Sequence, residues 1–166
     1  MRGLGFYWGV FGVVALLGSA VLRIGLRVLE LRQYSLSPVQ WGVLLGFGVW
    51  MLYAEGIKGF HYNFAPRVVA RACHLREHPR PVLALLAPLF CMGYIHATRK
   101  RRLTSILVTS AIVLLVLTVR LLPQPWRGII DCGVVAGLAV GIGSLLWYWA
   151  RALFTRQAPP IALDLP

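Results

Sequence analysis

The chain has 166 residues, of which 58% are hydrophobic and 13% are charged. Ordinary soluble domains carry about 25% charged residues, so this composition excludes a soluble globular protein and makes the lipid bilayer the main solvent. Seventeen Lys and Arg oppose five Asp and Glu, a formal net charge of +12. Because the basic residues lie at the ends of apolar runs, where cations meet lipid headgroups, we attribute this charge to membrane topology and predict no nucleic-acid binding.

Five apolar runs, each of roughly 20 residues, follow one another along the chain and predict five transmembrane helices. They cover about residues 6–22, 39–60, 81–98, 103–122 and 129–149. Residues 1–154 are therefore expected to form a single polytopic membrane domain of the all-α class. The proline-containing segment 155–166 is expected to be an extended or disordered tail.

A shorter amphipathic helix is predicted at about 66–78, between the second and third runs. Proline is tolerated in the first turn of a helix, where Pro66 would lie. Polar residues recur after it at spacings of four, three and four, at Arg67, Arg71, His74 and His78. An apolar stripe lies opposite them, so we expect this helix to lie at the membrane surface with its basic side facing the headgroups.

The third run leaves the number of spans open, because it has only 18 residues and contains Pro88 near its middle. It either crosses the bilayer or enters and returns as a re-entrant hairpin. With five spans, Lys and Arg divide eight against nine between the two sides; with a hairpin they divide twelve against five, which favours four spans and cytoplasmic termini. A hairpin must satisfy its backbone within the protein, however, so we predict five spans and keep four plus a hairpin as the alternative.

Three polar residues near the end of the second run are the first candidates for function. Glu55, Lys58 and His61 are spaced three apart in a predicted helix. A carboxylate inside a bilayer costs several kcal/mol unless it is paired, so Glu55 is expected to have a partner, and Lys58 is the nearest. The group is either a proton or ion relay or a structural ion pair.

A second polar group, Arg120, Arg127 and Asp131, flanks the turn between the fourth and fifth runs. In a five-span chain this turn lies on the same side as the amphipathic helix. The sequence therefore predicts one interfacial pocket, built from Glu55, Lys58, His61, Arg67, Arg71, Arg120, Arg127 and Asp131. Because guanidinium groups pair phosphate bidentately, such a pocket suits an anionic lipid headgroup; a structural salt-bridge network is the alternative.

Small residues at four-residue spacing recur in two of the predicted helices. Gly42 and Gly46 form a GxxxG pair in the second run, and Gly133, Gly137 and Gly141 extend the pattern in the fifth. Such spacings let another helix approach closely. We interpret them as sites of helix packing or of docking to a partner protein.

No catalytic or cofactor-binding signature is found in the sequence. His61 and His96 are predicted at opposite ends of consecutive spans and cannot share a haem iron. The three cysteines form no CxxC or Cys/His pattern, so neither a disulfide framework nor a zinc site is indicated. We therefore predict no metal and no cofactor, and we favour a non-enzymatic role.

These observations favour a small multi-pass accessory or scaffold protein of the cell inner membrane. It would dock into or assemble a larger membrane complex, by binding another membrane protein or itself, and it would bind anionic lipid headgroups. The alternatives are a small proton- or ion-coupled transporter that uses the intramembrane acid/base cluster and, less favoured, a lipid-modifying membrane enzyme.

Overall fold

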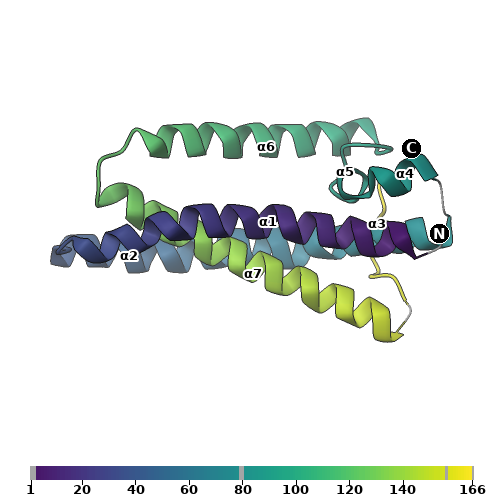
Figure 1. Cartoon of the computed structure of the whole chain (residues 1–166), viewed down its shortest axis with the longest axis horizontal. Coiled ribbons are helices and arrows are strands. Elements are labelled where there is room, and N and C mark those ends of the chain that lie inside the picture. Colours follow the sequence, from purple (N-terminus) through teal and green to yellow (C-terminus); the bar gives the residue numbers. More distant parts are fainter. Residues whose placement is uncertain (1–2, 79–80, 156, 166) are drawn as a thin grey trace.

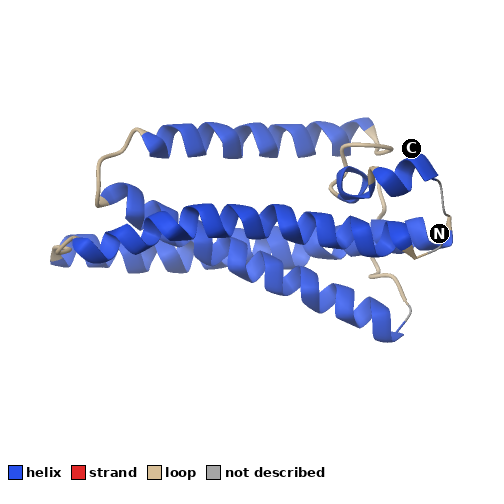
Figure 2. Ribbon diagram, in the orientation of Figure 1, coloured by secondary structure: helices blue, strands red, loops and turns tan. Residues whose placement is uncertain are grey.

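The computed structural model describes residues 3–78, 81–155 and 157–165, which form helices joined by short loops and contain no strand (Figures 1 and 2). The elements are α1 (Leu4–Glu30), the 3₁₀ turn η1 (Leu31–Gln33), α2 (Pro38–Met51), the π-helix η2 (Leu52–Phe64), α3 (Ala65–Glu77), α4 (Pro81–Leu85), α5 (Ala87–Cys91), α6 (Arg99–Arg120) and α7 (Trp126–Thr155). The fold is therefore all-α, as the composition predicted.

Four helices of the described chain are long and apolar enough to cross a membrane: Leu4–Gln33, Pro38–Glu77, Arg99–Arg120 and Trp126–Thr155. The predicted fifth span at 81–98 is not among them. It forms α4 and α5, each of five residues and about 7.5 Å long, followed by a loop. Pro88 begins a new helical turn there, and positive φ angles at Gly93 and His96 reverse the chain. The predicted count of five is thus not confirmed, and the path resembles the four-span alternative.

The second long helix is continuous from Pro38 to Glu77 and contains three segments with different geometry. It begins at a capping box, in which Ser37 and Gln40 exchange side-chain to backbone hydrogen bonds. Its middle segment, η2, has the wide turns of a π-helix, an uncommon geometry. These wide turns end just before Pro66, whose ring would clash with the carbonyl of Tyr62 in an α-helix.

The structure contains a helix close to the bounds of the predicted surface helix, but this helix has different neighbours from those expected. The sequence placed it at 66–78, separate and interfacial, whereas α3 covers Ala65–Glu77 and continues directly from η2. Its apolar stripe, which consists of Val68, Ala72 and Leu75, is buried where α3 packs against α1, α5 and α7. The apolar stripe therefore packs within the protein. A helix that packs on a protein core and a helix that lies on a lipid surface have the same periodicity of apolar residues, so the sequence pattern does not distinguish them.

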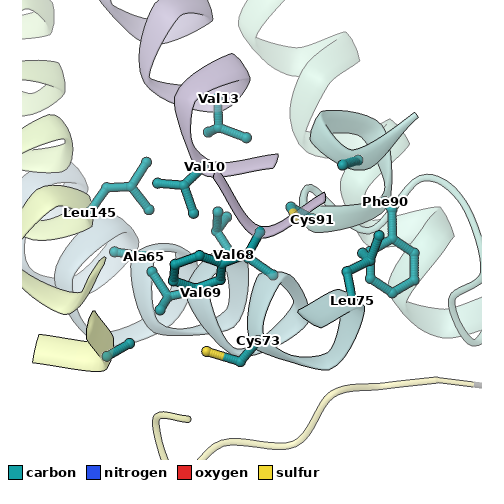
Figure 3. Close-up of a cluster of buried hydrophobic side chains, with 14 residues drawn as sticks. Val10, Val13, Ala65, Val68, Val69, Cys73, Leu75, Phe90, Cys91 and Leu145 are labelled. Carbon is teal, nitrogen blue, oxygen red and sulfur yellow. The ribbon is translucent and has the colours of Figure 1, made fainter. Parts of the chain in front are cut away.

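Helix α7 lies at the centre of the bundle and packs against α1, α2, η2 and α3. The largest core cluster lies where α1, α3, α5 and α7 meet, near the N-terminus and the end of α7. Figure 3 shows Val10 of α1 and Leu145 of α7 extending towards each other above Val68 and Val69 of α3. This end of the molecule is therefore better packed than the end that carries η1.

Helix α6 runs along one edge of the bundle and makes little contact with the other long helices (Figure 1). Its buried residues are Ser105 and Val119, and its apolar side chains are exposed around most of its circumference. An apolar surface of this kind is expected to face lipid tails in a membrane. The segment 157–165 returns from α7 without helical structure, and Leu165 packs against the core cluster.

Candidate functional site

The structure does not bring the eight residues of the predicted pocket together. Arg120, Arg127 and Asp131 lie around the turn between α6 and α7, at one end of the bundle, whereas Arg67 and Arg71 of α3 lie at the other (Figure 1). The pocket required the segment 81–98 to cross the membrane and so bring these ends together. Because that segment turns back within one end, the two arginine groups stay apart.

Asp131 and Arg127 form the one ion pair among the described residues. Arg127 Nε lies 3.9 Å from Asp131 Oδ2, one helical turn away on α7. The carboxylate is buried, and Arg27 of α1 lies within electrostatic range of it. Asp131 therefore joins α1 to α7 electrostatically at this end, while the side chain of Arg120 is exposed.

Glu55, Lys58 and His61 lie on η2 but point in different directions. Glu55 and Lys58 are exposed, and the Lys58 ammonium lies 5.0 Å from the centre of the Tyr53 ring. His61 turns inward, with Nδ1 at 3.1 Å from the Ser144 hydroxyl of α7. In a π-helix the residues that share a face are about four to five positions apart, so the spacing of three that suggested a cluster does not produce one.

Three glycines of α7, Gly133, Gly137 and Gly141, lie directly against α2 and η2. A Cβ added to Gly133 or Gly141 would lie 2.6 Å from the ring of Phe47 or Phe60, and one added to Gly137 would lie 3.2 Å from the Cβ of Glu55. By contrast, Gly42 and Gly46 have no neighbouring atom within 4 Å. The glycine pattern of the fifth run thus packs within the chain, whereas that of the second run is open.

Arg71 forms the densest polar contacts in the described structure. Its side chain is 2% exposed, and its guanidinium donates to four backbone carbonyls: Phe90 at 2.7 Å, Leu163 at 2.7 Å, His96 at 2.8 Å and Ile95 at 3.0 Å. It also stacks over the Phe90 ring, with Cζ 4.4 Å from the ring centre. Arg71 therefore ties α3 to the loop after α5 and to the C-terminal segment.

Sequence reasoning placed Arg71 in a headgroup-facing stripe and missed this role. It also missed Arg101, which lies on the first turn of α6 within electrostatic range of Arg67. Arg67 Nε is buried and has no hydrogen-bond partner in the described part of the chain. The sequence does show that arginines are concentrated on α3 and at 99–102. This concentration does not indicate that the two segments lie close together.

His61 and His96, which the sequence analysis excluded as joint haem ligands, lie on different elements of the described structure. His61 contacts Ser144 and the ring of Tyr148, and His96 is exposed in the loop before α6. Across residues 3–78, 81–155 and 157–165, no group of three or more His, Cys, Asp or Glu side chains is placed to hold a metal ion. Comparisons with protein families, curated proteins and solved structures found no match to this chain.

Proposed function

We propose that this protein is a non-enzymatic accessory subunit of the cell inner membrane that binds a transmembrane helix of another membrane protein. The observation that carries the proposal is Lys58, an exposed ammonium on a membrane-spanning helix whose described partner is the ring of Tyr53. A basic side chain near the centre of a bilayer costs about 3 kcal/mol even by the most lenient scale, so it calls for a partner. A carboxylate on a neighbouring helix would supply one.

The depth of Lys58 follows from its neighbours on α7. Glu55 lies against Gly137 and Phe60 lies against Gly141, so Lys58 lies at a level between them. Helix α7 runs from Trp126 to Thr155, which places that level near its middle. The apolar run of α7 covers about residues 129–149, so at about 1.5 Å per residue its ends lie roughly 15 Å from this level, and Lys58 is close to the middle of the hydrocarbon region.

The surface around Lys58 has the shape that a partner helix requires. We call it the docking face; it consists of Gly42, Gly46, Trp50, Tyr53, Lys58 and Tyr62. These residues lie on the side of α2 and η2 away from α7, and all six are exposed. The two glycines would allow the backbone of a second helix to approach closely, and the aromatic rings would extend the contact.

We further propose that the chain crosses the membrane four times, with both termini in the cytoplasm. In that topology twelve of the 17 basic residues lie on the side of the termini and of α3 to α5, which the positive-inside rule favours. The transporter and enzyme hypotheses receive less support, because Glu55, Lys58 and His61 share no hydrogen bond or ion pair among the described residues.

Photo-cross-linking in cells tests the accessory role. A photoreactive residue at Trp50, on the docking face, is expected to trap one partner protein, and Gly46→Leu is expected to reduce that product at least tenfold. Gly143→Leu is the matched control, because Gly143 is equally open but lies on α7 outside the docking face. A product that contains only this chain would replace the accessory role with self-assembly, and equal losses in both variants would exclude the docking face.

A further inference from the structure

A second feature, independent of the docking face, lies where α3 meets the first turn of α6. Arg67 of α3 and Arg101 of α6 are both partly buried and lie within electrostatic range of each other. Arg67 Nε is enclosed and has no hydrogen-bond partner among the described residues. Two like charges in this position repel each other, and a buried donor without an acceptor costs about 1 to 3 kcal/mol.

The surrounding charges do not neutralise this pair. Arg71 adds a third guanidinium within range of Arg101, but its donors are already occupied by backbone carbonyls. Asp164 is the carboxylate within range of Arg101, and no described acid forms an ion pair with either Arg67 or Arg101. Among the described residues, Asp164 is thus one carboxylate within range of Arg71 and Arg101, while Arg67 adds a third guanidinium next to Arg101, so the described groups hold an excess of positive charge.

The depth of the site indicates where its counter-ion comes from. Arg101 is followed after one residue by Leu103, the start of the exposed apolar run of α6, so the site lies where α6 passes out of the hydrocarbon region. At this depth the available anions are the phosphate groups of lipids and phosphate from solution. Arginine pairs phosphate through two parallel N–H donors, and the unpartnered Nε shows that the described protein does not supply an acceptor for this end of Arg67.

We propose that Arg67 and Arg101 together bind one phosphate group, supplied by the headgroup of an anionic phospholipid. The phosphate bridges the two guanidinium groups and so joins α6, which is otherwise loosely packed, to α3. Asp164 competes with the phosphate for Arg101. Replacing the Asp164 carboxylate should therefore strengthen phosphate binding. If diffuse surface charge attracted the lipid instead, replacing Asp164 would change binding no more than replacing any other acidic residue.

Native mass spectrometry of the full chain in a neutral detergent tests the proposal, with phosphatidylglycerol, phosphatidylcholine and inorganic phosphate as probes. The wild type is expected to retain one phosphatidylglycerol with at least tenfold preference over phosphatidylcholine. Arg67→Gln and Arg101→Gln should each weaken that binding at least tenfold, and Asp164→Asn should strengthen it two- to fivefold. Asn suits the positive φ at this position, so this change keeps the backbone conformation.

The control is Arg102→Gln, which removes the same charge from an exposed position on the same turn of α6. It should change phosphatidylglycerol binding less than twofold. An equal loss in Arg102→Gln and Arg101→Gln, or no retained phosphatidylglycerol in the wild type, would overturn the lipid site. Binding of inorganic phosphate at millimolar concentration that blocks the lipid would instead assign the same two arginines to free phosphate. Far-ultraviolet circular dichroism of each variant verifies that it is folded.

Discussion

The guanidinium of Arg71 stacks on the ring of Phe90 and donates its Nε hydrogen to the carbonyl of the same residue, 2.7 Å away. Arg71 therefore contacts both the side chain and the backbone of Phe90. Its other donors bind the loop that contains Ile95 and His96 and the C-terminal segment at Leu163. Arg71→Met keeps much of the apolar stem but leaves four carbonyls without their donor. We expect this change to lower the free energy of unfolding by about 3 kcal/mol or more, because unsatisfied buried carbonyls are costly.

Thermal unfolding in detergent measures the effect of Arg71→Met, and Arg102→Met is the matched control. Arg102 is an exposed arginine at the same end of the molecule, so its replacement should shift the midpoint by no more than 1 or 2 °C. Similar midpoints for the two variants would show that the Arg71 network contributes little to stability.

The class of the fold and most of its long apolar helices could be predicted because they depend on local composition. The apolar runs at 103–122 and 129–149 and the glycines of the fifth run follow from residue type and spacing alone. The contacts of Arg71 could not be predicted, because its acceptors lie 19 to 92 residues away and are backbone carbonyls, which every residue carries. No residue type at those positions signals the interaction.

The expected grouping of Glu55, Lys58 and His61 rested on a different assumption, namely α-helical periodicity through the second run. With that period Glu55, Lys58 and His61 share a face. In η2 the wider turns separate them, so that Lys58 meets Tyr53 and His61 meets Ser144. Two glycines and a following proline weaken the α-helix here, but they do not reveal which alternative geometry the segment adopts.

Close packing of α7 against η2 predicts that Gly141 tolerates no larger side chain. A Cβ at this position would lie 2.6 Å from the Phe60 ring. Gly141→Ala should therefore lower the free energy of unfolding by about 1 to 3 kcal/mol, which thermal unfolding would detect as a lower midpoint. Gly143→Ala, at an open position two residues away, should be neutral or slightly stabilising. Combining Gly141→Ala with Phe60→Leu should recover part of the loss; no recovery would mean that the clash with Phe60 is not its cause.

Cys91 on α5 is predicted to be chemically inert in the folded protein. It is 1% exposed, and burial raises the pKa of its thiol to about 12, although the nearby Arg71 opposes this shift. The thiolate is the reactive form, so at pH 8 N-ethylmaleimide should label Cys91 only after unfolding in sodium dodecyl sulfate.

The raised pKa of Cys91 also predicts how its contribution to stability depends on pH. An unfolded thiol has a pKa near 8.5, so the contribution of Cys91 to stability is complete below that pH and is lost as the pH rises from there towards about 12.

The labelling of Cys91 by N-ethylmaleimide is measured by mass spectrometry of the peptide that contains this residue. Rapid labelling of the native protein at pH 8 would contradict this prediction and would show that the α4–α5 segment opens readily.

Membrane topology gives the sharpest test of the architecture, because the two topologies differ at positions that flank the segment 81–98. In the four-span arrangement Glu77 and Lys100 lie at the same end of the bundle, and Gln33 lies at the opposite end. We expect single cysteines at 77 and 100 to react with a membrane-impermeant maleimide from the same side, and one at 33 from the other. A Cys132→Ser background removes the more accessible native thiol, since Cys73 and Cys91 are buried. Labelling of 77 and 100 from opposite sides would establish a fifth crossing and restore the pocket that the sequence predicted.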